Sequence, residues 1–374
     1  MATVKLGDIA IEAKSSNKGD KTGIRIVGLE HLTPSNVTLS SWSEDTENTF
    51  TKEFSKGDVL FGRRRAYLKK AAMAPFDGIC SGDITVIRAI DDKVYPDLLP
   101  FIIQNDFLFD FAVGKSAGSL SPRVKWTHLK EFAIELPSMP EQCKLAETLW
   151  SINETKNAYK NLINKTDKLV KSQFIEMFGK GYETIKLCDL ATFRRGSFPQ
   201  PYGKPEWYDG EGAMPFVQVA DVGENMRLVE DTKQKISVLA QPKSIYVPTG
   251  SVVVTLQGSI GRVAITQYDC YMDRTLAVFE SFKTEVNQLC FAYQLKQKFA
   301  KEAEVARGVT IKTITKEEFS NFEIAKVPIA LQNRFAEFIQ QSDKSKFALQ
   351  EAIKDLDALS KKIIAENLIP AGKE

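Results

Sequence analysis

The chain of 374 residues is poor in the side chains that bind metals and carry out hydrolysis. It has two histidines and five cysteines, and no two cysteines form a CxxC pair. Because a zinc site needs His and Cys at close spacing, we expect no metal site. The odd, dispersed cysteines also argue against a secreted disulfide framework, so a reducing cytoplasm is the expected location.

We also expect no targeting segment and no membrane helix, and the net charge is small. Its start, MATVKLGDIAIEAK, has no basic segment followed by an apolar one, and no run approaches the roughly 18 apolar residues of a membrane helix. The 50 Lys and Arg nearly balance the 48 Asp and Glu, so any nucleic-acid surface must be a local patch. The length and the 43% hydrophobic content suit two or three globular domains.

Sequence signatures of enzymes that act on DNA are missing or misplaced. The Asn/Asp-Pro-Pro-aromatic tetrapeptide of amino-methylating methyltransferases is absent, and the glycines of residues 258–261 lie between predicted strands, the wrong place for a cofactor loop. There is no P-loop lysine motif. Neither of the acid-x-Lys tripeptides at 12–14 and 154–156 has a clear Pro-Asp partner, and the second lies on a predicted long helix. His31 and His128 have no nearby Ser or Cys signature of a hydrolytic triad. We therefore expect no catalytic residues.

Two long stretches carry the same helical pattern. Residues 137–178 open with prolines, which suit a helix start, and then place apolar residues mostly three or four apart. Residues 327–368 align on them at an offset of 190 without a gap, and Lys156 and Lys346 interrupt the apolar pattern at the same heptad position. The two matched rows of apolar residues, called seams here, predict that the two helices pack on each other. The alternative is two surface helices that cover separate cores.

The repeat extends to the segments before each helix. VKLGDIA at 4–10 returns as IKLCDLA at 185–191, and residues 57–61 fall on 250–254 at an offset of 193. Residues 57–61 and 250–254 are each predicted to form a strand that a loop and a second strand follow. The frame is kept while the loop contents differ, RRRAY in the first half and QGSI in the second, as expected of two modules that present different residues from one scaffold.

Two further segments complete the predicted halves. Residues 97–111 and 287–306 read as helices by their apolar spacing. Residues 194–212, RRGSFPQPYGKPEWYDGEG, have no counterpart in the first half, and their prolines and glycines predict an inserted loop. The sequence thus predicts two α+β domains, each followed by one long helix.

Three motifs in this order of parts carry a family resemblance. GDVLFGRR (57–64) and GSVVVTLQGSIGR (250–262) are similar to a strand–loop–strand element, and PSMPEQ (137–142) to the entry of a central conserved helix. VPIALQ (327–332) is a degraded copy with Leu331 in place of the Glu. Together they resemble the specificity subunit of type I restriction–modification enzymes over nearly the whole chain.

The resemblance implies an α+β fold with two globular target-recognition domains in tandem. Each domain is followed by a long helix, and the two helices pack as an antiparallel coiled coil with pseudo-twofold symmetry. The implied parts are the first target-recognition domain (1–136), the central conserved helix (137–180), the second target-recognition domain (181–327) and the distal conserved helix (328–374). Each domain would read one half of a bipartite, asymmetric DNA site, with the helix pair as spacer.

The resemblance also implies the partners. The chain would be a non-catalytic subunit without a cofactor of its own in the bacterial or archaeal cytoplasm, with double-stranded DNA as ligand and no membrane contact. It would dock two methyltransferase (modification) subunits, which use S-adenosylmethionine, and restriction subunits, which use ATP and Mg. The alternatives are the recognition subunit of another bifunctional restriction enzyme and a coiled-coil adaptor that does not bind DNA.

Basic, aromatic and amide side chains of the predicted loops are the candidate DNA contacts. Arg and Lys bind phosphates, Arg pairs bidentately with guanine, and Gln does so with adenine. The candidates of the first domain are Arg63, Arg64, Arg65, Tyr67, Lys69, Lys115, Ser116, Arg123 and Lys125. Those of the second domain are Arg194, Arg195, Tyr202, Lys204, Gln257, Ser259, Arg262, Arg307 and Lys312. The alternative for each loop is an ordinary solvated surface.

The module arrangement yields a first prediction. A helix of about 38 residues is about 57 Å long at ~1.5 Å per residue, so we expect the helices to set the half-site spacing and each domain to set its own half-site. Exchanging residues 187–327 for the second domain of another family member should change one half-site and leave the other half-site and the gap intact. Mapping methylated adenines tests this, and a change in both half-sites would contradict it.

Overall fold

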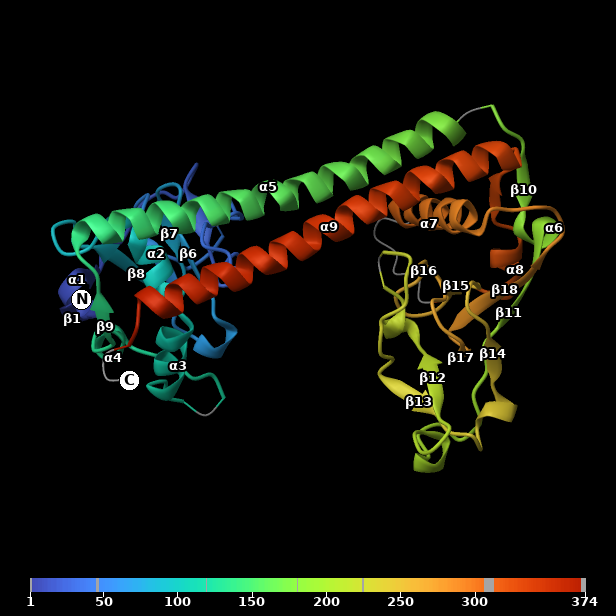
Figure 1. The fold of residues 1–374 in the computed structure, drawn as a ribbon, viewed down its shortest axis with the longest axis horizontal. Helices are drawn as coiled ribbons and strands as arrows, with labels where there is room; N and C mark the ends of the chain where they lie inside the picture. The colour runs from blue at the N-terminus through green and yellow to red at the C-terminus, as the bar shows by residue number, and fades with distance from the viewer. Residues whose placement is uncertain are drawn as a thin grey trace. The chain divides into compact units, whose positions relative to one another are not determined.

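The structure, a computed structural model, describes residues 2–44, 47–118, 120–179, 181–223, 225–305 and 313–370. The chain forms two compact units, Met1–Ile163 with Phe347–Glu374, and Asn164–Lys346. Each unit contains one α+β domain and part of both long helices, α5 and α9 (Figure 1). In the described residues, no helix combines the length and apolar character that a membrane crossing requires.

The domain of the first unit has three sheets. A four-stranded sheet has the order β2-β8-β5-β6, a three-stranded sheet the order β3-β7-β4, and β1 pairs with β9. The strands are β1 (Ala2–Lys5), β2 (Ala10–Glu12), β3 (Arg25–Val27), β4 (Lys52–Phe54), β5 (Val59–Gly62), β6 (Ala71–Met73), β7 (Gly78–Cys80), β8 (Ile84–Ala89) and β9 (Ala133–Leu136). The helices are α1 (Leu6–Ile9), η1 (Ala66–Leu68), η2 (Pro96–Leu98), α2 (Leu99–Ile103), α3 (Asp106–Gly114) and α4 (Trp126–Leu129).

Strand β5 lies between two hydrophobic cores. Successive side chains of a strand point to opposite faces, and all four residues of β5 are buried. Val59 and Phe61 join the core of the helical layer, where the Phe61 ring stacks on Phe109 of α3 at a centroid distance of 5.5 Å. Leu60 joins the core on the other face. An uninterrupted apolar strand is therefore required here.

The domain of the second unit repeats this plan. Its sheets have the orders β11-β18-β15-β16 and β13-β12-β17-β14, and β10 pairs with β19. The strands are β10 (Thr184–Lys186), β11 (Ala191–Arg195), β12 (Met214–Val217), β13 (Gln234–Ile236), β14 (Ile245–Val247), β15 (Val252–Thr255), β16 (Val263–Ile265), β17 (Cys270–Met272), β18 (Leu276–Phe282) and β19 (Glu323–Ala325). The helices are α6 (Leu187–Leu190), η3 (Pro205–Trp207), η4 (Val219–Asp221), η5 (Gln241–Lys243), α7 (Gln288–Val305) and α8 (Lys316–Ser320).

Strand β15 takes the place of β5 in the β11-β18-β15-β16 sheet of the second domain. Val252 and Val254 join one core and Val253 joins the other, which is the same division of alternate residues. The predicted α+β architecture, with two domains in tandem, is confirmed.

Two local predictions are wrong. Residues 97–111 do not form one helix, because the buried Asn105 interrupts them. Its Oδ1 accepts a hydrogen bond from Phe107 N (3.0 Å) and caps α3, and its Nδ2 donates to Leu368 O (2.9 Å). Arg194 and Arg195 do not belong to the inserted loop either, since both lie in β11 and pair in register with β18.

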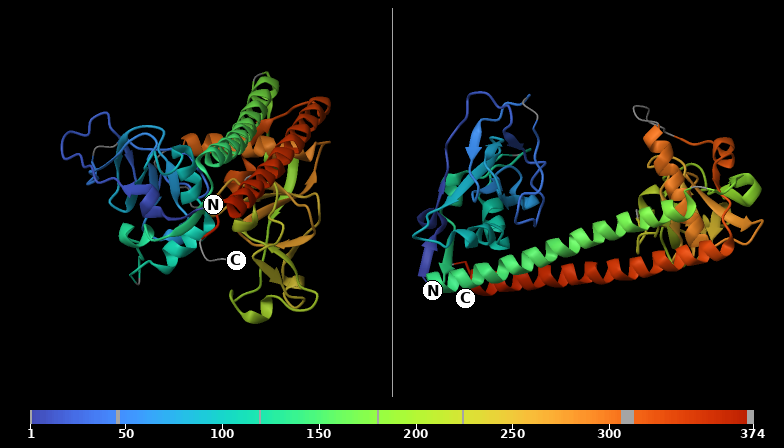
Figure 2. Two further views of the ribbon diagram at one scale, coloured as in Figure 1. Left: turned by 60° about the vertical axis from the view of Figure 1, so that its left-hand side comes forward. Right: turned by 90° about the horizontal axis from the view of Figure 1, so that it is seen from above.

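The long helices α5 (Met139–Phe178) and α9 (Ile329–Asn367) pack on each other, as the matched seams predict. In the first unit the start of α5 and the end of α9 share a core through Leu149 and Leu368. In the second unit the end of α5 meets the start of α9, with the rings of Phe178 and Phe335 5.1 Å apart. The helices are therefore antiparallel, and they lie side by side in both views of Figure 2.

A glutamine near the start of each long helix explains why this residue is kept in both motifs. Gln142 Oε1 accepts from Tyr95 N (2.9 Å), and Gln142 Nε2 donates to Pro137 O (3.0 Å). Gln332 makes the equivalent bonds, from Asn287 N (3.0 Å) and to Val327 O (2.8 Å). Both side chains are buried, so each amide provides hydrogen-bond partners for backbone groups that water does not reach.

The two lysines that interrupt the apolar seams pair across the helices. Lys156 Nζ lies 2.6 Å from Asp357 Oδ1, and the Lys156 side chain is only 8% exposed. Lys346 Nζ lies 2.8 Å from Asp167 Oδ1. The lysines are 190 positions apart in the sequence, and so are the aspartates, so each unit repeats the same pair with the helices exchanged.

The Lys156–Asp357 pair yields a stability prediction. Asp357→Ala leaves the buried ammonium without its carboxylate and should cost about 1–3 kcal/mol in the free energy of unfolding. Lys156→Met removes the charge itself and should be nearly neutral. Urea unfolding followed by circular dichroism measures both.

The matched control is Lys362→Ala, which removes an exposed partner of Glu366 on the same helix. It should change the stability by no more than about 0.5 kcal/mol. If Asp357→Ala were as mild as this control, the pair would not be a structural anchor.

Candidate nucleic-acid interface

Three chain segments meet in the first domain at the end of β5. The Arg63 amide donates to Asp83 O (3.0 Å), and the Val124 amide donates to Arg63 O (3.0 Å). Arg64 and Arg123 face each other in an antiparallel bridge. We call this group, residues 63–64, 81–83 and 121–124, the first junction.

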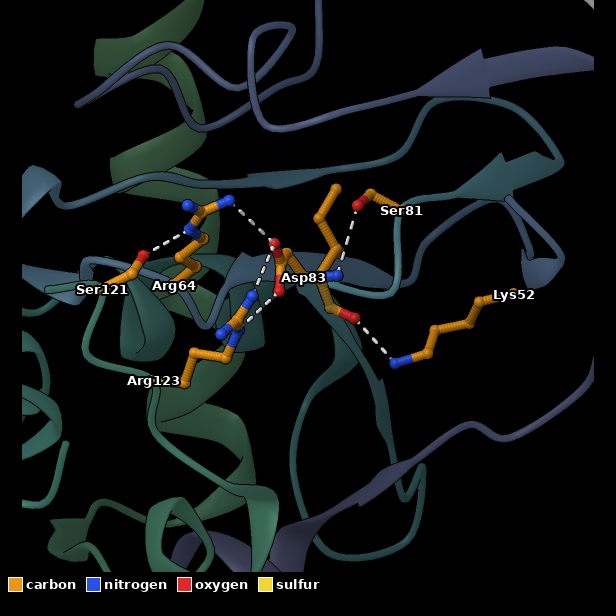
Figure 3. Close-up of polar contacts among 7 residues, drawn as sticks. Lys52, Arg64, Ser81, Asp83, Ser121 and Arg123 are labelled. Carbon is orange, nitrogen blue, oxygen red and sulfur yellow. Dashed lines mark hydrogen bonds and ion pairs between the residues drawn. The ribbon is translucent and has the colours of Figure 1, made fainter. Parts of the chain in front are cut away.

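The Asp83 carboxylate holds two guanidinium groups at the first junction (Figure 3). Arg123 Nε donates to Asp83 Oδ1 (2.8 Å), and Arg123 Nη2 and Arg64 Nη1 each lie 3.4 Å from Oδ2. Arg64 Nε also donates to Ser121 Oγ. Two of the predicted DNA contacts, Arg64 and Arg123, are thus brought together by an acidic residue that the sequence analysis did not select.

The position of Asp83 is fixed by its own loop. Its amide donates to Ser81 Oγ (3.2 Å), and the Ser81 amide donates to Val27 O (2.9 Å). Next to it, Lys52 Nζ donates to Ile84 O (2.7 Å), as Figure 3 shows. The carboxylate is therefore a rigid anchor for the longer arginine side chains.

At the first junction the aspartate is less exposed than the two arginines that it holds. The Asp83 side chain is 22% exposed, whereas those of Arg64 and Arg123 are 40% and 43% exposed. The hydrogen bond from Arg123, helped by the charges of Arg123 and Arg64, holds the pKa of the Asp83 carboxyl below its usual value. Asp83 is therefore ionised at neutral pH, and the arginines face outward around it.

The second domain has the same three-segment backbone arrangement. The Leu256 amide donates to Thr275 O (2.9 Å), the Ile314 amide donates to Leu256 O (3.0 Å), and Gln257 faces Thr313 in an antiparallel bridge. We call this group, residues 256–257, 273–275 and 313–314, the second junction. Gln257, Thr275 and Thr313 stand where the first junction has Arg64, Asp83 and Arg123.

A different cation lies at the second junction. Arg274 is exposed, and its guanidinium carbon lies 5.1 Å from the ring centroid of Tyr202. The neighbouring Asp273 Oδ1 accepts from the Thr275 amide (2.9 Å) and hydroxyl (2.6 Å). Arg274 is not among the contacts predicted from the sequence, although an alignment of the β17–β18 turn with the β7–β8 turn places it beside Thr275, the residue that matches Asp83.

The other residues of the Arg-rich loop differ in their exposure and in their partners. Arg65, just before η1, and Tyr67, within it, are exposed, and Tyr67 is 54% exposed. Arg63 Nε is buried and has no hydrogen-bond partner among the described residues. Lys69 instead forms an ion pair with Asp106 of α3.

The other candidates of the first domain are spread along the segment after α3. Lys115 Nζ lies 5.8 Å from the Phe111 ring, and Ser116 Oγ donates to Ala112 O (2.7 Å) at the helix end. Lys125 is exposed at the start of α4. Ser116 thus satisfies a helix carbonyl, while Lys125 keeps its charge in solvent.

Several candidates of the second domain have local partners. Arg194 pairs with Glu280 (2.6 Å), and Lys204 pairs with Glu206 (3.4 Å). Arg195 Nη2 donates to Ile314 O, and Arg262 Nη1 to Val222 O (3.2 Å). Arg195 therefore supports the second junction from β11.

The remaining candidates are Ser259, Arg307 and Lys312. Ser259 is exposed, and its carbonyl accepts from Thr255 Oγ1 (2.6 Å) in the β15–β16 turn. Arg307 and Lys312 lie outside the residues that the structure describes.

The first domain also carries an aromatic stack that sequence reasoning missed. The Arg25 guanidinium carbon lies 4.4 Å from the Phe76 ring centroid and 5.1 Å from that of Trp42, and Trp42 is exposed. No local motif joins these residues, because the pairing of β3 with β7 and the bridge between Ile26 and Ser43 bring them together from separate segments. Within the described ranges, no group of three or more His, Cys, Asp or Glu is placed to hold a metal ion.

Comparison with known proteins gives one family. A family model described as Type I restriction modification DNA specificity domain matches residues 1–166 and 179–356. Over 162 residues, the chain is 26% identical to the type I restriction enzyme EcoDI specificity subunit of Escherichia coli, a match that covers 40% of this chain and 35% of that protein.

Two solved structures share the fold over nearly the whole chain. One is a chain from a study of complex assembly and conformational transition of the type I R-M system, with a TM-score of 0.62, 22% identity, and coverage of 98% of this chain and 97% of that one. The other is the type-I restriction-modification system S subunit from M. genitalium, with a TM-score of 0.58, 14% identity, and coverage of 97% and 95%.

The lowered pKa of Asp83 yields a pH-dependent prediction. An aspartate whose folded pKa lies below its unfolded value of about 3.9 stabilises the fold above that pH, and the stabilisation is lost as the pH falls through the folded pKa. Asp83→Asn should therefore lower the urea midpoint at pH 7, and the difference from the parent should shrink below about pH 4.

The control is Asp92→Asn, an exposed aspartate in the turn after β8, which should leave the midpoint nearly unchanged. Urea unfolding between pH 3 and pH 7 provides the measurement. A deficit of Asp83→Asn that stayed constant down to the lowest pH would show that its charge is not the cause.

Proposed function

Because the chain belongs to the family of type I restriction modification DNA specificity domains, we propose that it is the DNA-recognition subunit of a type I restriction–modification complex. Residues 1–136 and 181–327 are the proposed target-recognition domains, and 137–180 and 328–374 the conserved helices. Each domain reads one half of a bipartite, asymmetric site. The chain has no catalytic role of its own in this proposal.

One observation carries the proposal of one half-site per domain. The two junctions share their backbone hydrogen bonds, Arg63–Asp83 in one and Leu256–Thr275 in the other, at nearly equal lengths. Their side chains differ in charge and hydrogen-bonding type. A common frame with exchanged polar groups is what two readers of different sequences need, because base edges are distinguished by their donor and acceptor patterns.

The long helices support the role of spacer. Helices α5 and α9 contain 40 and 39 residues, about 60 Å each at ~1.5 Å per residue. Neither contains glycine, and proline occurs only in the first turn of α5. A spacer needs such continuity, because a kink would let the half-site spacing vary.

Protein partners have a surface available on the same helices. Apolar side chains are exposed at Leu162, Leu169 and Ile175 of α5 and at Phe347 and Leu359 of α9. Exposed apolar groups of this kind favour protein docking. We assign the helices to the methyltransferase and restriction subunits, which supply S-adenosylmethionine, ATP and Mg chemistry.

The test is co-expression of the chain with its neighbouring methyltransferase subunit, followed by genome-wide mapping of methylated adenines. The expected result is one split motif, two short half-sites around a fixed gap of unspecified bases. A stable complex that methylates no such motif would overturn the proposal.

A further inference from the structure

We infer that Asp83 is a positioning residue for sequence reading by the first domain, where it holds Arg64 and Arg123 so that they select guanine. This inference rests on the proposed function. It adds two statements about one half-site: the first domain prefers guanine there, and Asp83 sets this preference without touching the base.

The geometry leaves the reading edges of both arginines available. Arg123 directs Nε and Nη2 to the carboxylate, and Arg64 directs Nε to Ser121 and Nη1 to Asp83. Among the described residues, Nη1 of Arg123 and Nη2 of Arg64 have no hydrogen-bond partner. The Arg123 guanidinium is thus held along its Nε–Nη2 edge and open at its end, whereas the Arg64 guanidinium is held at two edges and keeps Nη2 open.

Guanine is the base that fits the open end of Arg123, where Nη1 and the second hydrogen of Nη2 provide two parallel N–H donors. In the major groove it presents two acceptors, O6 and N7, whereas adenine presents one acceptor and one donor. An arginine with a fixed orientation also loses less side-chain entropy on binding than a free one. The held arginines therefore favour guanine over the other bases.

The same carboxylate argues against simple phosphate contacts. A surface that binds DNA phosphates gains affinity from each positive charge. The ionised Asp83 lies within 3.4 Å of both guanidinium groups, and its negative charge repels the DNA phosphates. Asp83 lowers non-specific attraction and restricts arginine orientation. Both effects serve base discrimination rather than general DNA affinity.

The second junction has no such anchor at the matching position. Thr275 replaces Asp83, and Gln257, a neutral donor and acceptor, replaces Arg64. A substitution at Thr275 therefore cannot release a held arginine pair, although it occupies the same place in the repeated frame. This makes Thr275→Ala the matched control for Asp83.

The experiment uses the chain in complex with its methyltransferase subunit. The methylation rate is measured on DNA duplexes that carry each base at every position of the two half-sites. Exchange of residues 187–327 assigns the half-site that belongs to the first domain. The variants are Asp83→Asn, Asp83→Glu, Arg64→Ala, Arg123→Ala and Thr275→Ala.

Asp83→Asn should lose about tenfold or more of the preference for one guanine in the half-site of the first domain. The other half-site should stay unchanged, and binding to unrelated DNA should stay equal or tighten because a negative charge is removed. Arg64→Ala or Arg123→Ala should lose the same guanine, and Asp83→Glu should restore part of the preference. Thr275→Ala should leave this half-site intact.

Three results would overturn the inference. These are a half-site of the first domain that contains no guanine in either strand, a variant motif identical to that of the parent, and an equal loss of methylation at all positions. If Asp83→Asn does not fold, Ser121→Ala removes the other hydrogen bond of Arg64 and should weaken the same guanine preference. A parent complex that methylates no split motif would contradict the proposed function itself, whereas a normal motif insensitive to Asp83 contradicts only this inference.

Discussion

The two long helices are held in one register by the lysine–aspartate pairs that cross between them. An apolar seam alone tolerates sliding by a heptad, because one leucine packs much like another. A buried ammonium does not, since a shift of one heptad, ~10.5 Å at ~1.5 Å per residue, would separate Lys156 from Asp357 and leave its charge without a partner. Lys346 pairs with Asp167 across the helices in the second unit, but it also pairs with Asp343 on its own helix, so it restricts sliding less than Lys156 does. Antiparallel register is therefore fixed chiefly in the first unit, by a lysine that interrupts a hydrophobic pattern.

In the first unit, a continuous set of contacts connects the helix pair to the first junction. The carbonyl of Leu368, at the end of α9, accepts from Asn105, which caps α3. Phe109 of α3 stacks on Phe61 of β5, and the junction begins two residues later at Arg63. Packed side chains and hydrogen bonds thus connect the helix pair to the arginines of the first junction.

Periodic features of the sequence were the predictable ones. The long helices, their packing and the domain repeat follow from apolar spacing and from Lys156 and Lys346 at one heptad position. Asp83 was not predictable, because it lies 19 residues from Arg64 and 40 from Arg123 in the chain, and a lone acid in a turn looks like a solvated residue. The break at Asn105 was hidden for the same reason, since its partner Leu368 is 263 residues away.

The junctions are assembled by backbone hydrogen bonds, from Arg63 to Asp83 and from Val124 to Arg63, with matching bonds at Leu256, Thr275 and Ile314. These bonds are independent of side-chain identity, except that proline cannot donate. Mutation can therefore replace the polar groups at these positions while the loops keep their course. The fold separates what must be inherited unchanged from what can diverge. Under the proposed function, a few point changes at these positions would give descendants of this chain new target sequences without passing through an unfolded ancestor.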